Sequence, residues 1–290
     1  MATIAADPSL QMSEADQKRL ERAYGLDKHW TLGYLDWASK ALQLDLGNSL
    51  RRKVPVKRLI RERLGNTLIL TVSSLLLSYL LSIPLGLWST ARAGTLSERS
   101  MALVLYMLYS LPTYVAALYL QILFAVKLDL LPLTGIKSEN FADLSAFGRT
   151  WDIFQHAILP VTCFTYGTLA YYSRFIKANM QEVVRQDYIR TAKAKGLGER
   201  TILLKHAFRN TLIPLVTLMG LTLPSLLSGA IILEMIFNWP GMGTLFFESL
   251  RERDYPTVMG LTLMFSVMTL AGQLLADILY SVVDPRVTYN

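Results

Sequence analysis

The sequence predicts an all-α membrane protein, a polytopic bundle of five transmembrane helices. Of its 290 residues, 52% are hydrophobic and only 18% are charged, and the mean hydropathy is +0.33. Soluble domains carry about 25% charged residues. Five stretches without Asp, Glu, Lys or Arg are long enough for the roughly 20 residues that cross a bilayer. None of them alternates with a period of two, so helices rather than barrel strands should satisfy the backbone in lipid.

The five stretches lie between charged residues in chain order. Their limits are Arg63 and Arg92, Arg99 and Lys127, Asp152 and Arg174, Arg209 and Glu234, and Asp254 and Asp277. Interior prolines occur in the first four, at Pro84, Pro112, Pro160, Pro214 and Pro224. An interior proline removes a helical hydrogen bond and bends the helix. The bends either are ordinary irregularities of membrane helices or frame a pathway or gate.

The distribution of charge suggests an orientation. Residues 174–209 hold nine Lys/Arg and three Asp/Glu, whereas residues 234–254 hold two and four. This contrast favours a cytoplasmic 174–209 loop and a cytoplasmic C-terminus. We therefore expect an extracytoplasmic segment over 1–65, a transmembrane domain over 66–284 and a cytoplasmic tail over 285–290. Summed over all loops the charge rule fails, with 12 Lys/Arg inside and 17 outside.

The basic loop 174–209 has the pattern of a helix, a glycine turn and a second helix. Apolar residues recur at helical spacing before Gly196 and Gly198 and resume after them. Spacing alone allows an amphipathic segment that lies on anionic lipid. The net charge of +7 is likewise better explained by cytoplasmic loops than by nucleic-acid binding, because the chain is too apolar for a basic soluble domain.

The amino-acid sequence of this loop resembles that of a known family. QDYIRTAKAKGL followed by KHAFRNTLIPLV is similar to the cytoplasmic "EAA" loop of ATP-binding-cassette (ABC) importer permeases, and most similar to the peptide and nickel branch. Gly196 matches the family's glycine, while Arg190, Thr191 and Ala192 stand where the general motif has Glu-Ala-Ala. The resemblance implies a coupling helix that docks into a groove of a partner ATPase subunit. The docking residues it implies are Asp187, Tyr188, Thr191, Ala192, Lys195, Gly196 and Leu197.

Other stretches resemble the same family in the same order, from about residue 7 to the C-terminus. The most informative is EMIFNWPGMGTLFFESLRERDYP, residues 234–256, which is similar to the external loop before the last helix. Prolines and glycines there predict a tight turn. The loop either forms a gate or binding-protein contact, or packs as a wedge between helices. Its candidate residues are Phe237, Trp239, Pro240, Gly241 and Gly243.

One departure from the family concerns the first transmembrane helix. Peptide-type permeases have such a helix ahead of the region where this sequence begins, and no counterpart is visible here. We expect that the true start lies upstream, or that the helix is lost or separately encoded. The remaining five helices match the core of shorter permeases in the superfamily.

The resemblance implies a multi-pass permease subunit of the bacterial inner (plasma) membrane that translocates peptides. Its expected partners are a second permease subunit, two ABC ATPase subunits, an extracytoplasmic substrate-binding protein and membrane lipid, but not nucleic acid. The sequence lacks G-x-x-x-x-G-K-[ST], so ATP hydrolysis is expected on the partner, and no cofactor or metal is expected.

Alternatives remain open at this level. The same scaffold serves importers of nickel or glutathione, and less favoured readings are an intramembrane enzyme using His156 or Asp277, or a membrane anchor. The single cysteine, Cys163, excludes an internal disulfide. The sequence does not identify the substrate. Polar candidates within the spans are Gln121, Gln155, Tyr166 and Gln273.

Overall fold

A computed structural model describes residues 29–228 and 231–283, and throughout this part of the chain the regular structure is helical. The only strand-like pairing in the described residues is an isolated bridge between Asn48 and Pro55. The α-helices are α2 (Trp30–Leu42), α3 (Val56–Ala91), α4 (Leu96–Ser110), α5 (Thr113–Leu120), α6 (Ala146–Val184), α7 (Asp187–Ala194), α8 (Glu199–Thr201), α9 (Phe208–Ser228), α10 (Ile231–Ile236), α11 (Met242–Arg251) and α12 (Tyr255–Val283). Two π-helical stretches, Gln121–Lys127 and Ile202–Ala207, and the 3₁₀ turn Phe141–Asp143 complete the set.

Over their described residues, the five predicted spans are helical apart from the break between α4 and α5. By length and apolar composition, Val56–Ala91 and Tyr255–Leu275 can each cross a membrane, and the bent pair Leu96–Ser110 and Thr113–Lys127 can count as one more. The third and fourth predicted spans lie in α6 and α9, which do not meet the same criterion over their described residues. The predicted all-α membrane fold is confirmed.

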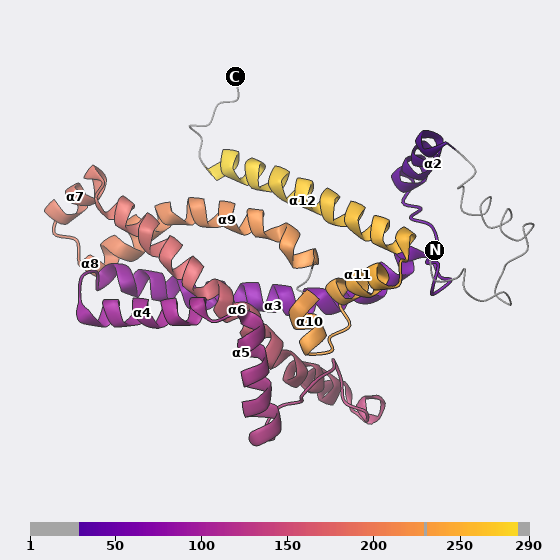
Figure 1. The fold of residues 1–290 in the computed structure, drawn as a ribbon. Helices are drawn as coiled ribbons and strands as arrows, with labels where there is room; N and C mark the ends of the chain where they lie inside the picture. The colour runs from indigo at the N-terminus through magenta and orange to yellow at the C-terminus, as the bar shows by residue number, and fades with distance from the viewer. Residues whose placement is uncertain (1–28, 229–230, 284–290) are drawn as a thin grey trace, which may run out of the picture.

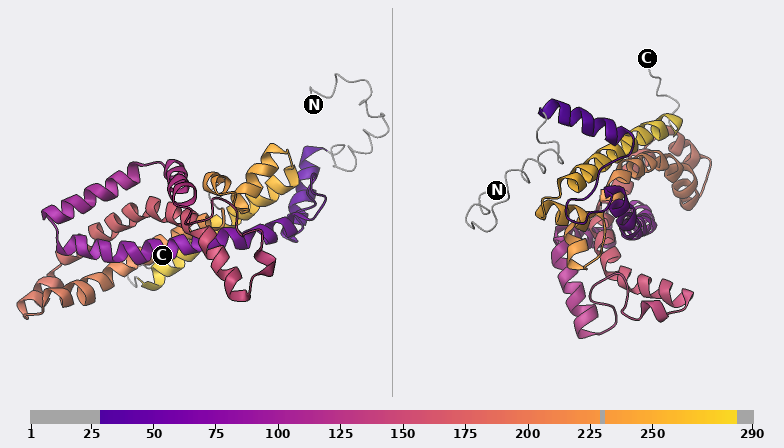
Figure 2. Two further views of the ribbon diagram at one scale, coloured as in Figure 1. Left: turned by 90° about the horizontal axis from the view of Figure 1, so that it is seen from below. Right: turned by 90° about the vertical axis from the view of Figure 1, so that its right-hand side faces the viewer.

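The long helices run alongside one another, so the bundle has two ends (Figures 1 and 2). α7 lies at one end, the α7 end, and α11 lies toward the other, the α11 end (Figure 1). α5 and the beginning of α6 project from the side of the bundle. The two loops singled out by the sequence are thus at opposite ends of the molecule.

Only one of the prolines within α3, α4–α5 and α6 interrupts its helix. The chain turns by 92° between α4 and α5. Pro112 is the N-cap of α5, and Leu111 before it has the extended backbone (φ −78°, ψ 120°) that a following proline favours. Pro84 and Pro160 instead lie inside the continuous helices α3 and α6. The sequence prediction of bends is therefore borne out as a break at Pro112.

Close packing of α3 against α6 forms the centre of the bundle. One face of α3 carries small buried residues at helical spacing: Thr67, Thr71, Ser74, Ser78, Ser82 and Gly86. Small residues let membrane helices approach closely. A Cβ added at Gly86 would lie 2.6 Å from Ile176 Cγ2, and the Ser78 and Thr168 hydroxyls are 2.7 Å apart. α6 is thereby fixed on α3, and its far end carries α7.

The segment before α3 is bonded to the start of α12. Asp254 is 1% exposed, and it accepts hydrogen bonds from the Ser49 hydroxyl (2.5 Å), the Leu50 amide (2.9 Å) and the Thr257 hydroxyl (2.8 Å). Arg52 forms a 2.6 Å ion pair with Glu248 of α11. Arg52, just before α3, therefore lies beside residues 234–256 at the α11 end; these residues are the loop predicted to be external, called the external loop below.

Candidate functional site

α7 is a short helix between two sharp turns. Asp187 occupies its first turn, where a carboxylate interacts favourably with the helix dipole, and lies 3.3 Å from the Arg190 guanidinium. Both side chains are largely exposed, at 96% and 76%, so their ion pair adds little to stability. The tertiary contacts of α7 must therefore hold it in place.

Two residues of α7 face the bundle. Ile189 is fully buried and Ala192 is 6% exposed. They join a core cluster that includes Ile176 and Met180 of α6 and Ala207 in the return toward α9. Ala192 was predicted to belong to the docking face, but its side chain packs inward, so it supports α7 instead of presenting a surface. The reason is local, because Ile189 and Ala192 are three residues apart and share one helical face.

The other six predicted docking residues are exposed. Tyr188 and Leu197 are 44% and 40% exposed, and Asp187, Thr191, Lys195 and Gly196 are also accessible. The Tyr188 hydroxyl accepts a 2.5 Å hydrogen bond from the Asn210 amide, which ties α7 to α9. The exposed side of the loop also carries Arg185, Lys193 and Arg200. The exposed side of the loop is therefore a basic surface with two exposed hydrophobic side chains, Tyr188 and Leu197.

Gly196 ends α7 in a Schellman motif. Its backbone has φ +76°, a left-handed conformation that favours glycine. Its amide donates to the Lys193 carbonyl (2.9 Å), and the next amide, of Leu197, donates to the Ala192 carbonyl (3.3 Å). The predicted sharp helix stop is confirmed. No heavy atom lies within 4 Å of a Cβ built at Gly196, so the space around this turn is open.

The external loop consists of α10, a tight turn and α11. The turn includes Asn238 at φ +48°. Phe237 is 2% exposed and Trp239 is fully buried. The Trp239 indole donates to the Asn66 carbonyl (2.9 Å), and the Asn66 amide donates to the Pro240 carbonyl (2.8 Å). These bonds fasten the loop to α3, so its aromatic residues pack as a wedge, whereas a gating role stays a prediction.

The centre of this loop is Glu234, a residue that the sequence marks only as the boundary of a predicted span. Its side chain is buried, with 1% of the residue exposed. It accepts hydrogen bonds from the Thr244 amide (2.8 Å) and the Thr67 hydroxyl (3.1 Å). Burial raises its pKa, and these hydrogen bonds only partly offset the effect. The sequence feature that could have pointed to Glu234 is an acidic residue at the end of an apolar stretch, followed by Gly241 and Gly243.

The two glycines leave room for that carboxylate. A Cβ at Gly241 would overlap the Glu234 carboxylate, and one at Gly243 would lie 2.9 Å from the Ile231 backbone nitrogen and 3.0 Å from Glu234 Oε2. Both glycines were predicted to form a tight turn. Neither has a positive φ, so they serve close approach rather than a left-handed turn.

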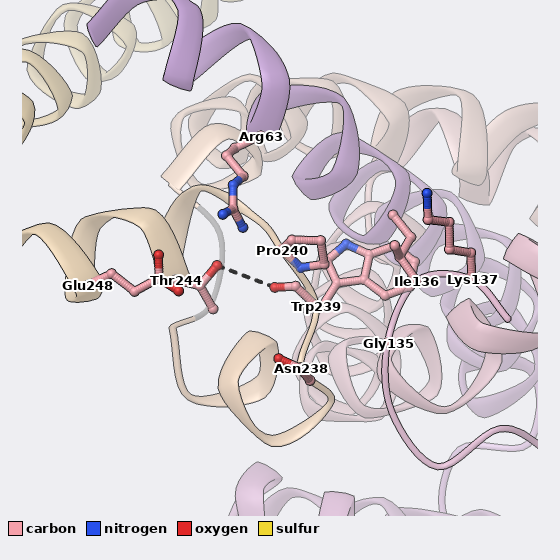
Figure 3. A pocket seen from close by; sticks show the side chains of 9 residues that line it. All are labelled: Arg63, Gly135, Ile136, Lys137, Asn238, Trp239, Pro240, Thr244 and Glu248. Carbon is pink, nitrogen blue, oxygen red and sulfur yellow. Dashed lines mark hydrogen bonds between the residues drawn. The ribbon is translucent and has the colours of Figure 1, made fainter. Parts of the chain in front are cut away.

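A cavity of about 370 Å³ opens beside the wedge (Figure 3). Arg63 of α3, Lys137 of the segment before α6, and Glu248 of α11 line it together with Trp239 and Pro240. We call it the outer cavity. Because three of these side chains are charged, the outer cavity is polar, unlike the apolar core that surrounds Trp239. It lies at the α11 end of the bundle.

His156 and Asp152 lie together at the start of α6. The Ser138 hydroxyl and amide both donate to the Asp152 carboxylate, at 2.5 and 2.9 Å, and His156 Nδ1 lies 2.8 Å from the Asp152 carbonyl. Burial opposes ionisation of Asp152, but the hydrogen bonds from Ser138 outweigh it and lower its pKa. The Asp152 carboxylate thus holds Ser138, and His156 Nδ1 lies 3.6 Å from Asp152 Oδ1. This arrangement gives no support to the enzymatic alternative at His156.

Comparisons with known proteins identify the family of the chain. A family model described as binding-protein-dependent transport system inner membrane component matches residues 82–289. The chain belongs to this family. As a member of the binding-protein-dependent permeases, it is a permease component of an ABC transporter in the inner membrane.

Similar permeases are known from several bacteria. The chain is 38% identical over 288 residues to the oligopeptide transport system permease protein AppB of Bacillus subtilis, covering 99% of this chain and 89% of that protein. It is 34% identical over 282 residues to the dipeptide transport system permease protein DppB of Escherichia coli, covering 92% and 83%. A solved chain of the inward-facing MetNI methionine ABC transporter superimposes with a TM-score of 0.62 at 14% identity, covering 79% of this chain and 97% of that one. This last likeness establishes the shared fold.

Proposed function

We propose that this permease moves short peptides across the inner membrane, driven by two ABC ATPase subunits that hydrolyse ATP. A second permease subunit completes the pathway, and an extracytoplasmic binding protein delivers the substrate. The names of the relatives AppB and DppB support a peptide substrate. Nickel or glutathione are the alternatives on the same scaffold.

The observation that carries the proposal is the construction of α7. Ile189 and Ala192 anchor it, Gly196 ends it sharply, and Tyr188 and Leu197 remain exposed beside basic side chains. A partner groove can hold such a helix without unfolding it. We infer that the exposed residues Asp187, Tyr188, Thr191, Lys195, Gly196 and Leu197 contact the ATPase subunit.

The core around α7 supplies a route for coupling. Ile189 packs in one cluster with residues of α6, α3 and the return to α9. Packed cores resist continuous deformation, so displacement of α7 by the closing ATPase pair should shift α6 and α9 as rigid elements. We therefore propose that ATP binding changes the access of the pathway through this cluster. The proposal places the α7 end in the cytoplasm, where the ATPase subunits are, and the α11 end on the extracytoplasmic side.

At the α11 end we propose that residues 237–243 act as the external gate or the contact for the binding protein. The bonds from Asn66 and Thr67 fasten this loop to α3, so a movement of α3 would carry the loop with it. The outer cavity offers Arg63 and Lys137 on the same side.

The proposal is tested by Leu197→Asp in the assembled transporter. A carboxylate in a protein contact that excludes water is unfavourable, and one such change commonly weakens association by roughly tenfold or more. We expect loss of ATPase co-purification and of labelled-dipeptide uptake, while the chain still inserts. Leu42→Asp is the matched control, since Leu42 is 87% exposed and lies in α2, far from α7. Unchanged association and uptake for Leu197→Asp would contradict the docking role.

Substrate choice needs a separate measurement. Uptake of labelled dipeptide is measured while an excess of unlabelled dipeptide, Ni²⁺ or glutathione is present. Competition by dipeptide alone supports the peptide assignment, and competition by Ni²⁺ or glutathione alone transfers the assignment to that solute. No competition by any of the three, with insertion and ATPase binding intact, argues against all three assignments.

A further inference from the structure

The last membrane-spanning helix, α12, carries a row of exposed polar side chains. Thr262, Ser266, Thr269 and Gln273 follow at intervals of four, three and four residues, and all four are exposed. With about 3.6 residues per turn, these intervals place them on one line along the helix. Asp277, also exposed, continues the same line one turn further. We call the first four residues the polar row.

The rest of the exposed surface of α12 is apolar. Leu270, Leu274 and Ile278 are 66%, 61% and 49% exposed. Leu274 follows Gln273 directly, so it points about 100° away around the helix. The face that packs on the bundle is a third one, with Thr257 and Leu261 fully buried. The exposed circumference therefore divides into an apolar arc suited to lipid and a narrow polar row.

The polar row is poorly suited to lipid. The hydroxyls of Thr262, Ser266 and Thr269 donate to carbonyls one turn earlier, at 2.8, 2.9 and 2.8 Å. Such bonds make hydroxyls tolerable anywhere on a helix. The Gln273 side-chain amide is different, because it has no hydrogen-bond partner within the described part of the chain. Hydrocarbon offers an amide no partner, whereas water does.

The polar row also forms a groove next to the external loop. Phe246 of α11 and Phe265 of α12 lie beside it, with ring centroids 6.0 Å apart. The groove has a volume of about 520 Å³, follows the polar row as far as Gln273, and is also lined by Leu270 at the edge of the apolar arc. α12 lies at the margin of the bundle, with α9 on one side (Figure 1). The groove thus begins beside Phe246 of α11 and runs along a helix long and apolar enough to cross the membrane.

We propose that the polar row of α12 is one wall of the water-filled path through which the solute crosses. This inference rests on the proposed function, and the solute class is a short zwitterionic peptide with its hydration. Hydroxyl and amide groups can exchange hydrogen bonds with a peptide backbone without holding a charge tightly. A wall of this kind suits conduction, which requires binding weak enough to permit release. The second permease subunit would form the facing wall.

The test is cysteine accessibility in the assembled transporter in membranes. Cys163 is fully buried and is replaced by alanine to give the parent. Single cysteines are placed at Ser266, Thr269 and Gln273. The controls on the apolar arc are Leu274, at the depth of Gln273, and Ile278, about one turn further along the helix. A hydrophilic, membrane-impermeant thiol reagent is applied from the outside and, in inverted vesicles, from the inside. Because the thiolate reacts and forms in water, we expect labelling at the polar row to be at least roughly tenfold faster than at the controls.

The outcomes separate the inference from the proposed function. Slow labelling at both sets of positions would mean that the row packs dry against another helix, and equal or faster labelling of the controls would place water on the other face. Either result overturns the inference. Fast labelling of the polar row that excess dipeptide slows supports it. Dipeptide uptake by the parent is measured separately. If the parent takes up no dipeptide but the labelling pattern is intact, the peptide assignment is wrong, while the polar row still lines a water-filled path.

Discussion

The Thr67 hydroxyl donates a hydrogen bond to the Glu234 carboxylate across 3.1 Å and accepts one from the Met242 amide across 2.7 Å. One side chain of α3 therefore joins α10 to the first residue of α11. Thr67 and Glu234 are both buried, at 0% and 1% exposure, so water cannot replace either bond. The external loop depends on this contact for its position.

Thr67→Val tests that dependence with little change of volume. It leaves the buried Glu234 carboxylate and the Met242 amide each one partner short, and an unsatisfied buried polar group costs about 1–3 kcal/mol. We expect a lower Tm in detergent and faster proteolysis within residues 231–251. Thr90→Val is the control, because the Thr90 hydroxyl donates to the Gly86 carbonyl of its own helix. An equal loss of Tm in both variants would contradict a special role for Thr67.

Glu234 should make the stability of this loop depend on pH. Burial raises its pKa in the folded chain above the ordinary carboxyl value. Its stabilising contribution is therefore fully present below the ordinary pKa and is lost as the pH rises through the raised one. We expect the Tm of the wild type to fall across that window and the fall to be smaller in Glu234→Gln. Parallel curves for the two proteins would show that another group titrates.

The glycine that faces Glu234 gives a steric prediction. In Gly243→Ala, the new Cβ would lie 2.9 Å from the Ile231 backbone nitrogen. Overpacking of this kind costs about 1–3 kcal/mol. Gly65→Ala is the matched control in α3, where nothing lies within 4 Å of the added Cβ, so the change should stabilise that helix by about 0.5–1 kcal/mol. Thermal unfolding of the two variants should shift Tm in opposite directions, and a neutral Gly243→Ala would disprove the close approach.

The sequence predicted those features that depend on neighbouring residues. The helix stop at Gly196 and the break at Pro112 follow from local backbone chemistry, so they could be foreseen. Pro84 and Pro160 show the limit of this reasoning, since packing keeps their helices continuous. The family resemblance located both loops, but it did not indicate that Ala192 points inward.

The role of Glu234 could not be derived in the same way. Its partner Thr67 comes from α3, far away in sequence, and only the packing of the external loop on that helix brings them together. The polar row of α12 could be predicted from the sequence only in part. Its spacing is visible in the sequence, yet its exposure beside an apolar arc depends on which face α9 and α11 cover.

The C-terminal cap of α7 offers the sharpest paired experiment. Gly196 has φ +76° and Gly198 has φ −65°, and nothing lies within 4 Å of a Cβ at either position. An alanine at Gly196 thus introduces backbone strain of about 1–2 kcal/mol without a steric clash, whereas one at Gly198 introduces neither. We expect Gly196→Ala to speed amide exchange over residues 187–194 and to weaken ATPase co-purification, and Gly198→Ala to leave both unchanged. Equal behaviour of the two variants would mean that the geometry of this turn does not control docking. A loss of ATPase binding in Gly196→Ala without faster exchange would instead identify the glycine as a direct contact, because the strain would then have left α7 intact.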